Sequence, residues 1–146
     1  MIKLFLDVEP VAQGRPRIIY IGKKPSVKDP EKSKQFKELC ADLARVYMNN
    51  GRMVKFGPKI PLEARFEFII PRPIHMDKSR TLPVVRPDLD NYVKAIKDAL
   101  NEVCYHDDSQ IVNLIARKRY VEPGHAAGIE VDIIALQAEK ESPPIV

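Results

Sequence analysis

The sequence predicts an α+β fold: a single two-layer domain in which a small mixed sheet carries two main helices on one face. Several short segments alternate apolar and polar residues, which is typical of half-buried strands. Two longer segments repeat apolar residues at helical spacing. These segments follow one another in the order ββαβαββ, and such a mixture indicates helices packed against one sheet.

Length and composition are consistent with one globular domain. The chain has 146 residues, of which 45% are hydrophobic and 30% charged. We expect residues 1–138 to form the domain and residues 139–146 to be a frayed tail. No segment approaches the ~18 apolar residues of a membrane helix, and acidic residues from Asp7 onward interrupt any signal-peptide core. We therefore expect a cytoplasmic protein without membrane contact.

The first half of the chain supplies two predicted strands and a long helix. Residues 2–8 alternate cleanly, and residues 18–21 form a short β-like run between two basic turns. The helix is expected to begin with Asp29 as its N-cap and to run to about residue 49. Asn50-Gly51 then ends it, since glycine commonly follows the last helical turn.

The second half supplies a strand, a helix and two closing strands. Residues 62–70 alternate as a long strand, and the proline-bounded segment 71–87 is expected to be irregular. A second helix is predicted from about residue 89 to 104. Strands at about 109–121 and 129–137 complete the sheet.

Two cysteines, Cys40 and Cys104, fall in the helical apolar patterns. Their number and spacing match neither a disulfide framework nor a zinc site. They are therefore predicted to be reduced, structural thiols.

The charge is unevenly distributed along the chain. The total is +4, but residues 1–59 carry 13 basic and 6 acidic side chains, a net of +7, whereas residues 86–146 carry 7 and 11, a net of −4. A basic region beside an acidic one suits a surface that holds phosphates around a metal-binding centre. The alternative is that charge along the sequence does not reflect grouping in the folded protein.

Two aspartates stand where the second helix is predicted to begin. Residues two apart in a regular helix point about 200° apart, so Asp88 and Asp90 converge only if Asp88 lies just outside the helix. Pro87 favours that position for Asp88 as an N-cap. Gathered carboxylates suit Mg²⁺ or Mn²⁺, and Asp107-Asp108 in the following turn would supply a third acid.

Two further side chains lie close to these acids in the sequence. Lys94 follows Asp90 by one helical turn and would neutralise charge on a cleaved phosphodiester. Asn91 would orient a metal ligand or a water molecule.

Each of these features also has a purely structural explanation. Asp88 would then only cap the helix, where the helix dipole favours an acid. Asp90, Lys94 and Asp98 would form a solvated ladder of ion pairs, and Asp107-Asp108 would belong to an ordinary turn.

The ordered combination of these residues resembles the RusA family of endodeoxyribonucleases, over about residues 13–137. The residues that carry the resemblance are Arg86-Pro87-Asp88-Leu89-Asp90-Asn91, Lys94, Asp98-Ala99-Leu100-Asn101, Asp107-Asp108-Ser109-Gln110 and the basic Gly14-Arg15-Pro16-Arg17. The resemblance implies that Asp88, Asp90 and Asp108 bind the metal, with Asp107 as the alternative to Asp108. It assigns Lys94 as the catalytic lysine.

The resemblance also implies a substrate and an assembly. Members of the family resolve four-way (Holliday) junctions in DNA recombination and repair. They are homodimers with two metal-dependent active sites, and bacteria or phages encode them. The alternatives are a non-catalytic module that binds branched DNA and a metal-dependent nuclease acting on flaps or RNA.

Basic residues supply the expected DNA-binding surface. The candidates are Arg15, Arg17, Lys23, Lys24, Arg86, Arg117 and Arg119. The five tyrosines are scattered and form no evident stacking platform. We therefore expect recognition of the DNA backbone and shape rather than of bases.

Overall fold

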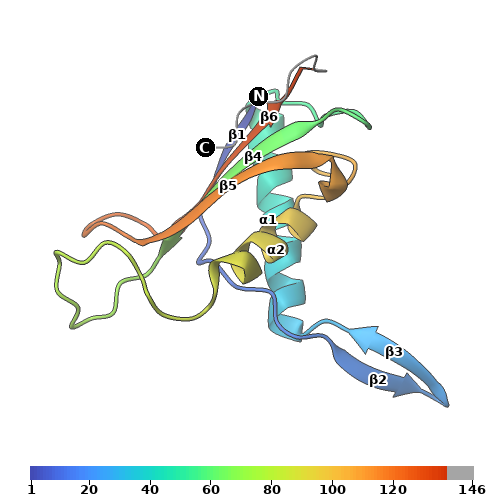
Figure 1. Cartoon of the computed structure of the whole chain (residues 1–146), viewed down its shortest axis with the longest axis horizontal. Coiled ribbons are helices and arrows are strands. Elements are labelled where there is room, and N and C mark those ends of the chain that lie inside the picture. The colour runs from blue at the N-terminus through green and yellow to red at the C-terminus, as the bar shows by residue number, and fades with distance from the viewer. Residues whose placement is uncertain (138–146) are drawn as a thin grey trace.

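The structure, a computed structural model, describes residues 1–137 and confirms the predicted α+β class (Figure 1). The predicted tail lies outside the described residues. The elements are β1 (Ile2–Leu6), β2 (Arg17–Ile21), β3 (Lys24–Lys28), α1 (Glu31–Asn50), β4 (Leu62–Ile70), α2 (Leu89–Ala99), the 3₁₀ turn η1 (Asp108–Gln110), β5 (Ile111–Tyr120) and β6 (Gly128–Ala135). No helix within residues 1–137 has the length and apolarity needed to cross a membrane.

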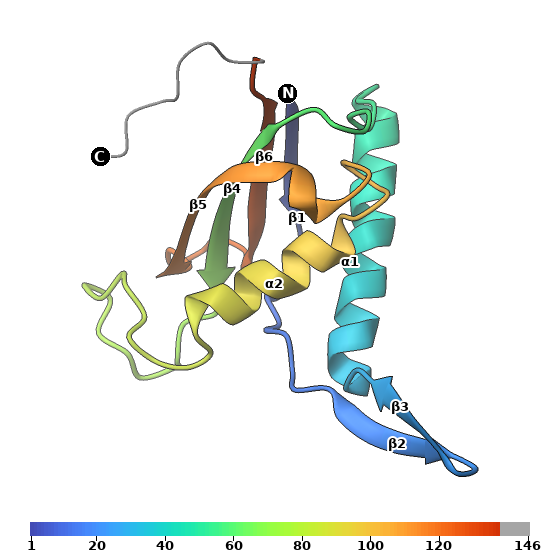
Figure 2. The same cartoon turned by 45° about the vertical axis from the view of Figure 1, so that its right-hand side comes forward.

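Four strands form the main sheet in the order β1-β6-β4-β5. β4 and β5 are parallel, while β6 is antiparallel to both β1 and β4. The register aligns Ile2, Ile133 and Ala64 on one face. These residues belong to a single buried core that also contains Cys40 of α1 and Ile96 of α2. Both helices therefore cover the same face of the sheet, as predicted (Figure 2).

The opposite face of the sheet carries charged side chains that pair with one another. Glu67 of β4 is paired with Arg117 at 2.7 Å and with Arg119, both on the neighbouring strand β5. Burial alone would raise the pKa of the Glu67 carboxyl. The hydrogen bonds and charges of Arg119 and Arg117 outweigh burial, so that the pKa is lowered.

The basic segment before α1 contains one more strand than predicted. Residues 22–25 were expected to be a turn, but Lys24–Lys28 pairs with β2 in a two-stranded antiparallel hairpin. Only Gly22 and Lys23 turn the chain, and Gly22 has the positive φ of 65° that glycine adopts without strain. Pro25 obscured this strand in the sequence, yet a hairpin has free outer edges where proline is tolerated.

The helix α1 begins differently from the prediction. Pro30 occupies the cap position and makes no side-chain cap hydrogen bond, so Asp29 is not the N-cap. The Asp29 carboxylate instead pairs with Lys37 Nζ at 3.0 Å, which draws it away from the free backbone amides of the first turn. The other end agrees with the prediction, because α1 ends at Asn50 and Gly51 follows.

The helix α2 is shorter than predicted. It ends at Ala99 rather than near Cys104. The backbone then turns sharply, with a positive φ of 63° at Glu102. Val103, Cys104 and Tyr105 remain buried after this turn, which explains why apolar spacing suggested a longer helix.

Both cysteines are free and buried, as predicted. Cys104 Sγ lies 3.7 Å from the sulfur of Met48. Burial raises the pKa of each thiol to about 12.

The Glu67 cluster leads to a prediction about stability and pH. Because the folded pKa is lowered, the carboxylate stabilises the fold above the unfolded pKa of about 4.3, and this contribution is lost as pH falls through the folded pKa. We expect Glu67→Gln to lower the free energy of unfolding by about 1–2 kcal/mol at pH 7. Urea unfolding at pH 7 and pH 3 measures the effect, which should shrink at the lower pH.

Glu130→Gln is the matched control, because Glu130 lies on the same face of the sheet and is exposed. A loss as large as that of Glu67→Gln in this control would contradict the assignment of stability to the arginine pairs.

Candidate active site

The two aspartates of the central motif lie together at the start of α2. Asp88 occupies the N-cap position with extended backbone, as predicted, but its side chain makes no cap hydrogen bond. Asp90 lies in the first turn, and both residues are exposed. Within residues 1–137, no hydrogen bond or ion pair engages either carboxylate. The capping explanation therefore accounts for the position of Asp88 but leaves its carboxylate free.

A lysine from β5 holds the segment that leads into this helix. Lys118 Nζ donates hydrogen bonds to the carbonyl oxygens of Val85, at 2.7 Å, and Pro87, at 2.9 Å. Alternation along the strand predicts that Lys118 lies on the opposite face from Arg117 and Arg119. The structure shows that this is the face that the helices cover, but the role of Lys118 in holding the start of α2 was not predicted.

The chain before the hairpin is fastened to the same helix turn. The backbone N–H of Gln13 donates to the carbonyl oxygen of Asn91 at 3.0 Å. The N–H of Gly14 donates to Ser33 Oγ at 2.9 Å, and a Cβ at Gly14 would lie only 2.8 Å from Pro30 Cγ. Close packing thus fixes where the hairpin leaves the body. Its basic residues begin next to the turn that carries Asp88 and Asp90.

Lys94 is exposed one turn after Asp90. The expected alternative, a ladder through Asp98, does not form: Asp98 pairs with Lys37 of α1 at 3.4 Å. Among the described residues, Lys94 has no ion-pair partner. It therefore stays free to contact an anionic ligand at the start of α2.

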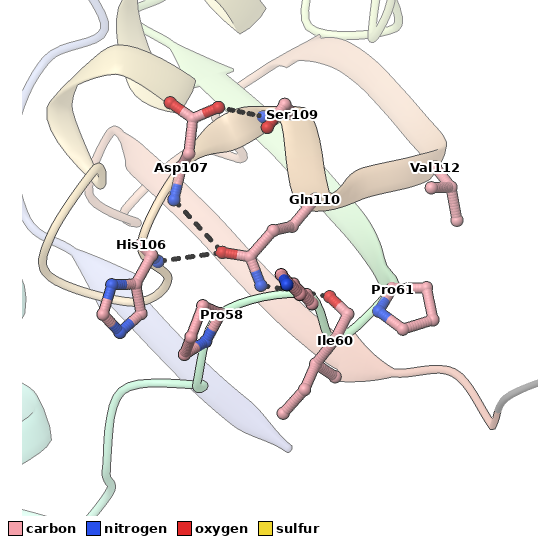
Figure 3. A pocket seen from close by; sticks show the side chains of 9 residues that line it. Pro58, Ile60, Pro61, His106, Asp107, Ser109, Gln110 and Val112 are labelled. Carbon is pink, nitrogen blue, oxygen red and sulfur yellow. Dashed lines mark hydrogen bonds between the residues drawn. The ribbon is translucent and has the colours of Figure 1, made fainter.

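Asp107 and Asp108 have different roles in the turn before β5. The Asp107 carboxylate accepts a hydrogen bond from Ser109 N at 3.1 Å, and the Gln110 side chain accepts from the backbone of His106 and Asp107 (Figure 3). The hydrogen bonds from Ser109 hold the pKa of Asp107 below its usual range. Asp107 thus caps the 3₁₀ turn, whereas no side chain or backbone group of residues 1–137 makes such a contact with the carboxylate of the half-buried Asp108.

The pocket drawn in Figure 3 lies beside this turn. Pro58, Ile60, Pro61 and Gln110 line it together with Asp107. Neither Asp88 nor Asp90 is among its lining residues. The pocket therefore belongs to the packing that supports the turn before β5, and it is separate from the acids of α2.

Asp108 lies near the opposite end of α2 from Asp88. Tyr105 Oη donates to the carbonyl oxygen of Lys97 at 2.8 Å, in the last turn of the helix. Burial raises the pKa of Tyr105, and the nearby charges of Asp108 and Asp98 raise it further. The helix has 11 residues, which corresponds to about 15 Å. Figures 1 and 2 both show η1 beside its far end.

A single chain therefore does not bring the three predicted acids together. Within residues 1–137, no group of three or more His, Cys, Asp or Glu side chains is close enough to hold a metal ion. The structure places Asp88, Asp90 and Lys94 at one end of α2 and Asp108 at the other.

The predicted DNA-binding residues fall into three places. Arg15, Arg17, Lys23 and Lys24 are exposed on or beside the hairpin, and Arg86 is exposed two residues before Asp88. Arg117 and Arg119 instead lie on the open face of the sheet, paired with Glu67. The hairpin begins near Asp88 and Asp90, and Arg86 also lies near them. Arg117 and Arg119 instead pair with Glu67 and stabilise the sheet.

A helix that presents two carboxylates and a lysine beside a basic hairpin is suited to a phosphate-bearing ligand. The family described as Endodeoxyribonuclease RusA matches residues 7–134, so the chain belongs to the RusA endodeoxyribonuclease family. This membership confirms the resemblance drawn from the sequence.

A relative from Bacillus subtilis (strain 168), uncharacterized protein YqaN, is similar over most of both chains. It is 37% identical over 129 residues, which cover 83% of this chain and 89% of the relative. The similarity therefore extends over most of the chain rather than over the acidic motif alone.

The lysine bridge from β5 leads to a prediction about the first turn of α2. Lys118→Met removes the donor to two carbonyl oxygens, and hydrogen bonds to a charged group contribute about 1.5–3 kcal/mol. We expect amide hydrogen exchange in residues 91–95, the first amides of α2 with backbone acceptors, to become roughly tenfold faster, since opening of the helix start becomes less costly. Exchange followed by mass spectrometry measures this.

Arg117→Met is the control, because Arg117 is the preceding residue of β5 and points to the other face. Equal acceleration of residues 91–95 in both variants would show that Lys118 does not specifically hold the start of α2.

Proposed function

We propose that the protein is a structure-selective endodeoxyribonuclease that resolves four-way DNA junctions by metal-dependent phosphodiester hydrolysis, in the cytoplasm of a bacterial cell. The observation that carries this proposal is the free pair of carboxylates at the start of α2, next to Lys94. Family membership supports DNA as the substrate. The cation-rich hairpin that starts beside the same turn supports a phosphate-bearing ligand.

The residues at this end of α2 fit a hard divalent cation. No described residue engages the carboxylate of Asp88 or Asp90, and a bound cation would neutralise their charge. Asp88 and Asp90 would hold Mg²⁺ together with Asp108 of a second copy of the chain, with Mn²⁺ as a substitute, because both ions prefer oxygen ligands. When bound, the ion supplies an activated water and neutralises phosphate charge.

The chain's own side chains would position the scissile phosphate. Lys94 Nζ would neutralise the charge that develops on the phosphate oxygens, since it projects from the same helix face one turn after Asp90. Asn91, half-buried in the first turn, would orient a ligand or a water molecule. Asp107 serves the 3₁₀ turn instead, which leaves Asp108 as the third acid.

We infer that a second copy of the chain supplies this third acid. β5 is an edge strand of the main sheet and exposes the large apolar side chains of Val112, Leu114 and Ile115. Edge strands with unpaired backbone groups readily pair with a further strand. A twofold axis would pair two β5 edges antiparallel, so that the start of one strand lies beside the end of its partner.

This pairing would bring together the residues that one chain separates. Lys118, near the end of β5, bonds to the segment that leads into Asp88. Asp108 directly precedes the start of β5. Two active sites would then form per dimer, each with Asp88 and Asp90 from one copy and Asp108 from the other.

The metal assignment leads to a prediction about catalysis. We expect Asp90→Asn to lower junction cleavage about a hundredfold or more, because a direct metal ligand is lost. Binding of the junction should be unchanged or tighter, since one negative charge near the phosphates is removed. Cleavage of a synthetic four-way junction with and without Mg²⁺, and binding in Ca²⁺, measure the two effects.

Asp42→Asn is the control, because Asp42 is an exposed aspartate on the other helix, and it should cut at the parental rate. Parental cleavage by Asp90→Asn would refute the assignment. A flap and a linear duplex digested side by side would show whether the four-way junction is the preferred substrate.

The shared site leads to a separate prediction about mixed dimers. Asp90→Asn and Asp108→Asn are each expected to be inactive alone. After they are mixed and allowed to exchange subunits, each hybrid dimer has one intact site. Activity should therefore return to about a quarter of the wild-type value, since about half of the dimers are hybrids.

The activity would return as nicking of one strand, because the second site of a hybrid carries both substitutions. Gel assays that separate nicked from resolved junctions measure this outcome. If the mixture stays inactive although subunit exchange is demonstrated, the three acids do not act across two copies.

A further inference from the structure

The β2–β3 hairpin has two chemically different faces. The register pairs Ile18 with Val27 and Tyr20 with Pro25, so these four residues share one face. Three of them are large and almost fully exposed, with exposed fractions of 69% for Ile18, 71% for Tyr20 and 70% for Val27. The other face carries Arg17, Lys24 and Lys28 together with Ile19, Ser26 and Ile21.

The basic face, not the apolar one, turns toward the body of the protein. Arg17, Ile19 and Lys28 line a hollow against the start of α1 at Pro30 and Glu31. The hairpin itself projects well beyond the two layers (Figures 1 and 2). The described part of the chain therefore leaves the apolar face uncovered, which is unusual because a lone two-stranded hairpin is only marginally stable in water.

The positive charge of the β2–β3 hairpin and of the segment before it favours an anionic partner. Residues 10–28 contain Arg15, Arg17, Lys23, Lys24 and Lys28 and no acidic residue. Two hairpins facing each other in a dimer would bring these like charges together, which is destabilising. A stable protein interface also buries about 800 Å² on each partner over 20–30 residues, far more than four residues provide. Nucleic acid matches both properties, because phosphates attract the cations and bases accept apolar contacts.

The side chains on the apolar face of the hairpin favour contact with unstacked bases over binding in a duplex groove. A two-stranded ribbon fits the major groove, but it reads base edges through polar side chains. Ile18 and Val27 cannot make those hydrogen bonds. Aliphatic side chains instead act as wedges between base steps, and tyrosine stacks on bases of any sequence. When the four arms of a junction are not stacked on one another, each base pair at the branch point loses one stacking neighbour and becomes easier to separate than a base pair within a duplex.

We propose that the β2–β3 hairpin is a wedge that enters the branch point of the DNA junction. Its apolar face of Ile18, Tyr20 and Val27 separates the bases there, and the exposed Lys23 and Lys24 at its tip contact the flanking phosphates. This inference rests on the proposed junction substrate. The hydrogen bond from Gln13 to Asn91 fixes the base of the hairpin at the first turn of α2, so the wedge positions the strands near the acids.

Substitutions on the two faces of the hairpin test the wedge. Tyr20→Ser removes the stacking ring. Ile21→Ser is the matched control, because Ile21 lies on the other face with a similar exposed fraction, 69% against 71% for Tyr20. Tyr20→Phe retains the ring. Affinities for a four-way junction and for a linear duplex with the same arms are measured in Ca²⁺. A 2-aminopurine at the branch point reports unstacking by a rise in fluorescence.

We expect Tyr20→Ser to weaken junction binding about tenfold with little effect on duplex binding. It should also abolish the rise in fluorescence, whereas Ile21→Ser and Tyr20→Phe should behave as the wild type. Junction preference and fluorescence that persist in Tyr20→Ser would overturn the wedge while leaving the proposed function intact. A wild-type protein that does not prefer junctions would instead refute the proposed function and the wedge together.

The mass of each variant in solution tests whether a second copy of the chain covers the apolar face of the hairpin. Light scattering should give the same oligomeric state for Tyr20→Ser as for the wild type. A loss of oligomer in Tyr20→Ser alone would show that the apolar face docks against a second copy of the chain, and this result too would overturn the wedge.

Discussion

The parallel pairing of β4 with β5 determines where the candidate catalytic residues lie, because parallel neighbours are joined by a connection that returns across the sheet. Residues 71–110 form this connection and include α2. The helix therefore starts at the end where β4 and β5 finish, and it ends where β5 begins. Lys118 marks the first end through its bonds to the turn before Asp88. The same constraint separates Asp88 from Asp108 within one chain.

The sequence predicted those features that depend on neighbouring residues. Alternation located β1 and β4, and the fold class followed from the order of the elements. The position of Asp88 at the mouth of α2 followed from the proline before it. Local pattern failed where a distant contact decides the structure. Asp29 could have capped α1, but Lys37 competes for its carboxylate. The pairing of β4 with β5, which separates the acids, has no local signature.

Alternation along β5 is also a local pattern, and it does not reveal the distant contacts of the charged residues. The sequence places Arg117 and Arg119 on one face and Lys118 on the other, but it does not say which face the helices cover. The structure pairs the two arginines with Glu67 on the open face and turns the lysine toward α2. Of the basic residues predicted to bind DNA, those on the hairpin and beside Asp88 are therefore left without an acidic partner among the described residues, whereas the two on the sheet are paired. A count of basic residues along the chain does not reveal this distribution.

The reactivity of the two buried thiols reports the opening of the core. With a pKa of about 12, each cysteine is a thiolate in only about one molecule in 10⁵ at pH 7. An alkylating reagent therefore reacts mainly with molecules whose core has opened. Cys40 lies on α1, and Cys104, which follows α2, packs against Met48 of α1. Alkylation of either thiol therefore reports the loosening of the packing around α1, without any added label.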